Sequence, residues 1–213
     1  MVKPLSFSQY LTEAPLPDDW NGALFDEKIP FARRVRYAQE RAKRLGAGSS
    51  RVAFVIPYQG RDTVLKVAKN RKGAAQNEVE ARNLEDWYLK NMGISIPLID
   101  YDERNDQPTW IHTEKAEKIR DSDFKKLTGL TLSQIIDYAE AASGRNRNIN
   151  RSQFEGKVDE ENEFLQSMVD LVGNYTHLPT GDLRRLANWG LYKGQPVIID
   201  LGLDDDVFKS HYS

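Results

Sequence analysis

The strand-like segments of this sequence are concentrated before residue 116, whereas helix-like segments dominate after residue 121. Strands that come first and helices that follow are typical of an α+β protein, because neighbouring segments of one kind pack on each other. We therefore expect two lobes with a crevice between them. The 213 residues are enough for one domain divided in this way.

The first half reads as two hairpins and two helices. A basic helix is expected over Asp26–Leu45, and a second helix over residues 73–93, with Gly93 as its stop. In the first expected hairpin, the strands Arg51–Tyr58 and Thr63–Ala68 are joined by a turn at residues 59–62. In the second, strands over residues 96–102 and 109–116 are joined by a turn at residues 103–108.

The second half begins with a helix over residues 131–143, which Thr131 caps, and continues through a polar loop over residues 144–157. A further helix is expected over residues 159–175. The closing hairpin, "NWGLYKGQPVIIDLGL", turns at Lys-Gly-Gln and ends in an aspartate.

Composition excludes several classes of protein. The chain has no cysteine, which rules out disulfides and thiolate metal sites, and its three histidines are widely spaced. A net charge of -2 makes a nucleic-acid partner improbable. No apolar run is long enough to span a membrane, and the first residues lack the apolar core of a secretory signal. We expect a cytoplasmic protein.

Two groups of residues in the first half favour phosphate binding. The loop "GAGSS", residues 46–50, lets backbone amides approach an anion, although the same residues also mark an ordinary helix end and turn. Lys66 lies between apolar neighbours in a strand, and such a lysine is difficult to bury without an anion. Glu78 and Glu80 on the next helix both offer a carboxylate. Glu80 is preferred, because apolar residues follow it at helical spacing.

The second half adds further polar candidates. Asp182 lies in "GDLRRLAN", which ends in Asn188, and Asp200 follows a buried apolar strand. Aspartate is a poor strand residue, so Asp200 requires a cation, a cap or a turn.

The order of these motifs resembles the protein-kinase-like family, from "GAGSSRVAF" and "VLKVAK" through "NEVEARNLE" and "GDLRRLAN" to "IDLG". The resemblance implies a protein-kinase-like two-lobe fold with a five-stranded antiparallel N-lobe and a reduced helical C-lobe. It divides the chain into an N-terminal appendage (residues 1–30), the N-lobe (31–118) and the reduced C-lobe (119–213).

The resemblance also implies roles for single residues. Gly46 and Gly48 would cover the triphosphate of ATP, and Lys66 would contact its phosphates while Glu80 orients Lys66. Asp182 would accept a proton from the attacking hydroxyl. Asn188 and Asp200 would hold Mg²⁺, and the connector "TEKAEK", which contains Glu114, would meet the adenine.

This sequence departs from the family pattern in four places. Arg51 stands where the third loop glycine belongs, and Gly181 precedes Asp182 as in small-molecule kinases. Five residues separate Asp182 from Asn188 where the family has four, so that one residue must bulge or Asp182 is not the base. Only eleven residues follow Gly202, so we expect no activation segment.

Three functions remain open. The first is an ATP- and Mg²⁺-dependent phosphotransferase with an unknown acceptor. The second is an inactive pseudokinase that serves as a structural or interaction module and binds a protein partner through residues 1–30. Such a module would be similar to kinase-like proteins of tailed bacteriophages, and a phage protein would reside in the host cytoplasm or the virion. The third is an unrelated α+β binding protein, whose basic helix and segment "GRNRNINR" would contact nucleic acid or an acidic partner.

Overall fold

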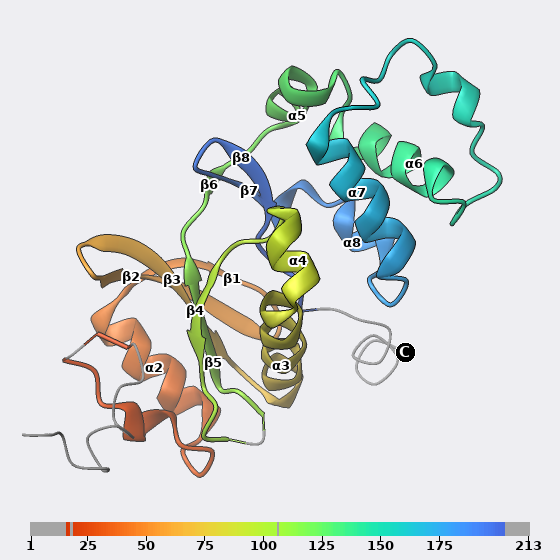
Figure 1. The fold of residues 1–213 in the computed structure, drawn as a ribbon. Helices are drawn as coiled ribbons and strands as arrows, with labels where there is room; N and C mark the ends of the chain where they lie inside the picture. Colours follow the sequence, from red (N-terminus) through yellow and green to blue (C-terminus); the bar gives the residue numbers. More distant parts are fainter. Residues whose placement is uncertain (1–15, 18, 106, 203–213) are drawn as a thin grey trace, which may run out of the picture. The chain divides into compact units, whose positions relative to one another are not determined.

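The computed structural model describes residues 16–202 apart from residues 18 and 106, and the chain forms two compact units (Figure 1). Among the described residues, unit 1 contains those from Leu16 to Ala81 together with Pro97–Lys115. Unit 2 contains Arg82–Ile96 and the described residues from Ala116 to Gly202.

Unit 1 is built on a five-stranded antiparallel sheet, which confirms the expected α+β class. Its strand order is β1-β2-β3-β5-β4. The turn between β2 and β3 has positive φ at Gln59 and Gly60, the geometry that suits a tight hairpin. The strands are β1 (Lys43–Ala47), β2 (Arg51–Tyr58), β3 (Arg61–Ala68), β4 (Leu98–Tyr101) and β5 (Trp110–Glu114).

The two faces of this sheet carry different residues, because successive side chains of a strand point to opposite sides. Phe54, Ile56, Leu65 and Val67 belong to a buried core shared with the helix α2 (Phe31–Arg41). The helix α3 (Arg71–Glu85) lies on the other side of the sheet from α2 (Figure 1). Alternate residues of β2 and β3, Lys66 among them, therefore face α3.

The segment expected as an N-terminal appendage falls into two parts. Residues 1–15 lie outside the described residues. From Leu16 onward the segment packs into the core of unit 1, where Trp20, Phe25 and Tyr37 form mutual ring contacts at 5.7–6.2 Å. The short 3-10 helix η1 (Gly22–Phe25) buries Phe25. Residues of this segment such as Leu16 and Phe25 are therefore part of the core of unit 1, and the expected protein partner stays a prediction.

The single helix predicted over Asp26–Leu45 is wrong at both ends. The α-helix begins at Phe31, after Pro30, and ends at Arg41. Residues Lys43–Ala47 are the edge strand β1, which pairs with β2. Lys and Arg favour a helix locally, so the pairing of β1 with β2 overrides the local preference.

The helix predicted over residues 73–93 is two helices, α3 and α4 (Trp87–Met92). Asp86 separates them, because its side chain accepts hydrogen bonds from the amides of Tyr88 and Leu89 as an N-cap. Gly93 ends α4 in the left-handed conformation, as predicted.

Helices and an aromatic cluster form the core of unit 2. The rings of Phe124, Phe164 and Trp189 lie within 5.4–6.1 Å of one another. Thr131 caps α6 as predicted, whereas α5 was missed. The remaining helices of unit 2 are α5 (Asp121–Thr128), α6 (Leu132–Ala142), η2 (Arg151–Phe154), α7 (Glu163–Asn174), α8 (Thr180–Leu183) and η3 (Leu186–Asn188).

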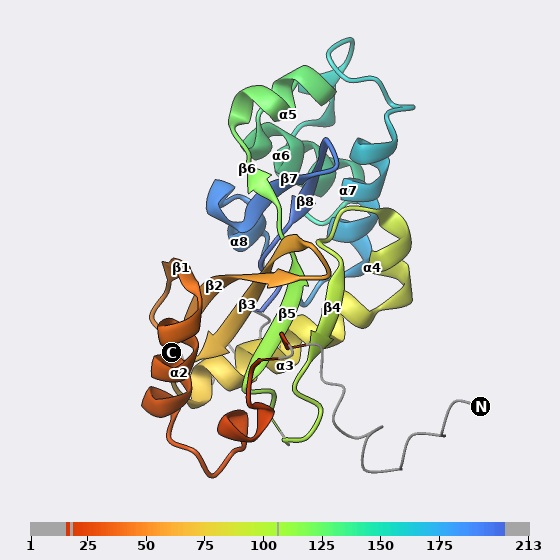
Figure 2. The same cartoon turned by 90° about the vertical axis from the view of Figure 1, so that its left-hand side faces the viewer.

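A three-stranded sheet completes unit 2 and contains the predicted closing hairpin. Its strands are β6 (Glu117–Lys118), β7 (Trp189–Tyr192) and β8 (Gln195–Ile198), labelled in Figure 2. Lys193 and Gly194 form the turn with positive φ at both positions. Residues 94–96 pair with the edge of β8 that does not contact β7, because their backbone exchanges hydrogen bonds with Ile198.

Within the described part of the chain, none of the helices is long and apolar enough to cross a bilayer.

Gly190 provides a test of the small sheet. A Cβ at this position would lie 2.5 Å from the Cβ of Ala116 and 3.0 Å from the carbonyl oxygen of Glu117. We expect Gly190→Ala to push β7 away from β6 and to lower the free energy of unfolding by about 1–3 kcal/mol in urea titrations. Gly181→Ala is the control, since a Cβ there meets nothing within 4 Å. Equal stability of the two variants would contradict this packing.

Candidate functional site

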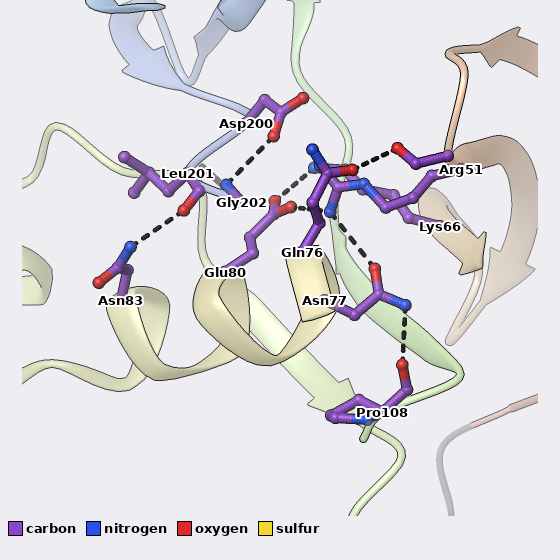
Figure 3. Close-up of polar contacts among 11 residues, drawn as sticks. Arg51, Lys66, Gln76, Asn77, Glu80, Asn83, Pro108, Asp200, Leu201 and Gly202 are labelled. Carbon is purple, nitrogen blue, oxygen red and sulfur yellow. Dashed lines mark hydrogen bonds and ion pairs between the residues drawn. The ribbon is translucent and has the colours of Figure 1, made fainter. Parts of the chain in front are cut away.

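Lys66 forms an ion pair with Glu80 inside unit 1 (Figure 3). Lys66 comes from β3 and Glu80 from α3. The Glu80 side chain is fully buried, and the Lys66 side chain is 12% exposed. Glu78, the other candidate partner, is exposed. The structure thus pairs Lys66 with Glu80, and the catalytic role of the pair stays a prediction.

A second cation, Arg51, binds the other oxygen of the same carboxylate. Its Nη1 contacts Oε2 of Glu80, whereas the Lys66 ammonium contacts Oε1. The same Nη1 donates to Oδ1 of Asn77 at 3.3 Å, and Nδ2 of Asn77 donates to the carbonyl of Pro108 at 3.1 Å (Figure 3). Each oxygen of Glu80 therefore has a cationic partner from a different strand.

The register of the hairpin explains why these residues meet. In the β2–β3 ladder Arg51 lies opposite Ala68, and Ala53 lies opposite Lys66. Arg51 and Lys66 therefore point to the same face of the sheet, two residues apart along the ladder. Burial of a carboxylate is tolerated because both oxygens have charged donors. Sequence reasoning missed Arg51 and treated it only as a missing glycine.

The "GAGSS" loop joins β1 to β2 and is tied to the start of α3. The ammonium of Lys69 donates to the carbonyl of Gly48 at 2.9 Å, and Ser50 Oγ hydrogen-bonds to Gln76. Gly73 permits the close approach, since a Cβ there would lie 2.2 Å from the Ser50 carbonyl oxygen. Loop and helix are thus held in one arrangement.

Gly46 and Gly48 have no structural need to be glycine. Neither has a positive φ, and a Cβ on either would meet nothing within 4 Å. Their lack of side chains leaves the backbone of the loop open to close approach by a ligand.

Glu114 faces away from Lys66. It pairs with Thr63 in the β3–β5 ladder, three residues from the partner of Lys66, so its side chain points to the other face of the sheet. There it binds Arg61 through several contacts of 2.6–3.1 Å. Its amide donates to the carbonyl of Pro97 at 3.0 Å. Its side chain is therefore not part of the Lys66 group.

In unit 2 a hydrogen bond joins Asp182 and Asn188 despite the extra residue between them. The Nδ2 of Asn188 donates to the backbone carbonyl of Asp182 at 3.0 Å. The turn at Arg184 and Arg185, between α8 and η3, takes up the added length. Because the amide nitrogen is engaged, Oδ1 of Asn188 is the atom that could serve as a ligand.

Arg184 anchors this segment to α6. Its Nη2 lies 2.7 Å from the carboxylate of Asp137 and 2.9 Å from that of Glu140. Trp189 Nε1 donates to the carbonyl of Leu183 at 2.8 Å, which fixes the end of α8 on β7. The backbone around Asp182 is therefore held from two sides.

The carboxylate of Asp182 has an unusual electrostatic environment. Burial raises the pKa of Asp182; Arg185, whose Nη1 lies 3.4 Å from its Oδ1, lowers the pKa, and the negative charge of Asp200 raises it. The net direction is upward. A carboxylate with a raised pKa is a better proton acceptor, as a general base requires.

Asp200 is exposed and closes a turn, because its Oδ1 accepts the amide of Gly202 at 3.2 Å. The next residue, Leu201, is buried, and its carbonyl accepts a hydrogen bond from Asn83 at 2.9 Å (Figure 3). The aspartate at the end of the strand thus has a local structural role in addition to any role as a ligand.

The donor atoms of unit 2 suit Mg²⁺. Asn188 and Asp200 offer an amide and a carboxylate oxygen, the kinds of ligand that this ion prefers. Among the residues that the structure describes, no group of three or more His, Cys, Asp or Glu side chains could hold a metal by itself. Mg²⁺ usually takes one or two carboxylates and completes its shell with water and substrate phosphates, so the residues present fit it.

Comparisons of the sequence with known proteins identify no relative. No protein-family model matches the chain, and the search of curated proteins gave no match. Solved structures of a thermostable mutant of aminoglycoside phosphotransferase APH(4)-Ia resemble it distantly. A variant complex with ADP and hygromycin B has a TM-score of 0.32 at 14% identity, covering 79% of this chain and 70% of that chain.

A second variant complex, with AMP-PNP and hygromycin B, has a TM-score of 0.32 at 13% identity and covers 76% of this chain and 66% of that chain. The apo form has a TM-score of 0.31 with the same identity and coverage. The chain thus spans about two thirds of the length of these enzymes. At such low TM-scores, we base the function on the side chains described above.

The shared carboxylate gives a test of stability. Glu80→Gln removes the charge of the buried carboxylate that Arg51 and Lys66 both contact, so we expect it to lower the free energy of unfolding by about 3–5 kcal/mol. Lys66→Met should cost markedly less, because Arg51 still neutralises Glu80. Urea denaturation of both variants measures the difference. Similar losses in the two variants would show that Arg51 does not compensate.

The raised pKa of Asp182 gives a test of pH dependence. The folded state holds the Asp182 proton more tightly than the unfolded chain, so stability falls as pH rises through the folded pKa. Asp182→Asn removes this penalty and should raise the Tm at pH 7. The gain should vanish near pH 4, close to the usual pKa of an unfolded aspartate.

The control is Asp170→Asn, which replaces an exposed aspartate on α7 and should leave the Tm unchanged at both pH values. A lower Tm for Asp182→Asn at pH 7 would contradict the proposed electrostatics.

Proposed function

We propose that this chain is a kinase-like phosphotransferase that uses ATP and Mg²⁺. The observation that carries the proposal is the buried Glu80 carboxylate with Lys66 and Arg51 on its two oxygens, beside a loop fixed to the same helix. Two cations that share one carboxylate suit a polyanionic ligand. In this proposal Lys66 binds the phosphates of ATP, and Gly46 and Gly48 let the loop backbone approach them.

The residues of unit 2 are assigned the chemistry of transfer. Asp182 accepts the proton of an acceptor hydroxyl, whose oxygen forms a bond to the γ-phosphorus. The bond from the γ-phosphorus to the β–γ bridging oxygen breaks, and its electron pair leaves with ADP. Burial supports this role for Asp182, because a raised pKa favours proton acceptance.

Asn188 and Asp200 would hold Mg²⁺ through Oδ1 and the carboxylate. The ion, when bound, neutralises charge on the phosphates. The hydrogen bond from Asn188 to the Asp182 carbonyl keeps the proposed ligand and the proposed base in one segment. Backbone groups of residues 113–118 are proposed to contact the adenine. We propose that the acceptor is a small molecule that carries a hydroxyl group. The reason is that Gly181 directly precedes Asp182, an arrangement similar to the motif of small-molecule kinases.

One observation favours a second candidate function, an inactive kinase-like binding module such as a phage interaction protein. Arg185 lies 3.4 Å from the Asp182 carboxylate, and this cation lowers its basicity. A protein of this kind would bind nucleotide without turnover.

The deciding experiment combines binding and turnover. Stabilisation by a ligand that binds only the folded state amounts to about 2.7 kcal/mol at one hundred times Kd. We expect ATP with Mg²⁺ to raise the Tm of the wild-type protein, and Lys66→Met to abolish the shift. Release or transfer of γ-phosphate should occur with the wild-type protein and be lost in Asp200→Ala.

A Tm shift without turnover would favour the binding module. No shift with ATP and Mg²⁺, or turnover unaffected in Asp200→Ala, would overturn the phosphotransferase. Arg36→Met serves as a control for charge, since Arg36 is 81% exposed and pairs with Glu40 on the surface of α2.

A further inference from the structure

Arg51 has no role in the phosphotransferase scheme beyond its contact with Glu80, yet it is among the least exposed charged residues of unit 1. Only 8% of its surface is exposed. It is the first residue of β2 and directly follows the "GAGSS" loop. Its backbone carbonyl accepts the amide of Gly48 at 3.0 Å, which closes that loop. A single residue thus contacts both the loop and the carboxylate that Lys66 uses.

The charge balance shows what Arg51 adds. A lysine alone with a buried glutamate forms a neutral pair, and the carboxylate then offsets most of the attraction of the ammonium for an anion. Arg51 occupies Oε2 of Glu80, so Lys66 shares this carboxylate with a second cation. The single negative charge of Glu80 is thus divided between two cations.

The contacts also make Arg51 a fixed support. Its Nη1 bonds Asn77, which is fully buried and is itself bound to the carbonyl of Pro108. Glu80 is therefore held by Arg51 whether or not the ammonium of Lys66 turns toward a ligand. Arginine suits this task, because its guanidinium is planar and is always charged.

We propose that Arg51 is a positioning residue for phosphate binding: it holds and partly neutralises Glu80, so that Glu80 offsets less of the attraction between Lys66 and a ligand with several phosphates. This inference rests on the proposed function. It predicts that the contribution of Arg51 increases with the charge of the ligand, because Coulomb attraction scales with that charge.

The test measures Kd for adenosine, AMP, ADP and ATP, each with Mg²⁺, in four proteins: wild type, Arg51→Met, Arg51→Gln and Arg51→Lys. We expect Arg51→Met to weaken ATP binding by about tenfold or more, as for loss of one charge-assisted interaction. The loss should be smaller for AMP and absent for adenosine. Arg51→Lys, which retains the charge, should recover most of the affinity for ATP.

Arg51→Gln removes the charge but keeps an N–H donor, so it decides the matter if Arg51→Met does not fold. Arg36→Met is the matched control and should bind all four ligands as the wild type does. If ATP binds to the wild type and equally well to the folded charge-removing variants, Arg51 is merely structural and the inference is overturned. A uniform loss across all four ligands, adenosine included, overturns it as well. Absence of ATP binding by the wild type overturns the proposed function, and this inference with it.

Discussion

A single buried carboxylate, that of Glu80, determines the arrangement of unit 1. It is fully excluded from solvent and contacts cations from two adjacent strands. An isolated charge in such a place would destabilise the fold by several kcal/mol, so the position of α3, the register of β2 with β3 and the direction of both cations depend on one another. The same arrangement places two cations on the face of the sheet toward α3, where the proposed function assigns phosphate binding.

The sequence predicted the fold well wherever hydrophobic spacing was regular. Strands β2 and β3, the caps at Thr131 and Gly93 and the closing hairpin follow from local patterns, which need no knowledge of distant contacts. The strand β1 was missed, because its residues Lys43–Ala47 have no alternating apolar pattern and gain their conformation from pairing with β2. The break at Asp86 was missed for a similar reason, since a cap inside a helical pattern competes with continuation of the helix.

The candidate site was accessible to sequence reasoning only in part. The pairing of Lys66 with Glu80 was anticipated from strand and helix spacing. The sequence pattern identified Arg51 only as a replacement for the third loop glycine and gave it no role. In the β2–β3 hairpin its side chain lies on the same face of the sheet as Lys66. The close approach of Gly73 to Ser50 depends on packing between segments that are distant in the sequence, so no local pattern predicts it. The bond from Asn188 to Asp182 shows that an added residue can be absorbed without separating the two.

The ties between the "GAGSS" loop and the segment that leads into α3 have a consequence for the thermodynamics of recognition. The carbonyls of Gly48 and Ser49 accept hydrogen bonds from Lys69 and Asn70, and Ser50 is bound to Gln76. The loop therefore loses its conformational entropy when the chain folds. If the loop binds phosphate as proposed, a ligand would meet a preformed backbone, and the entropic cost of ordering the loop on binding would be small.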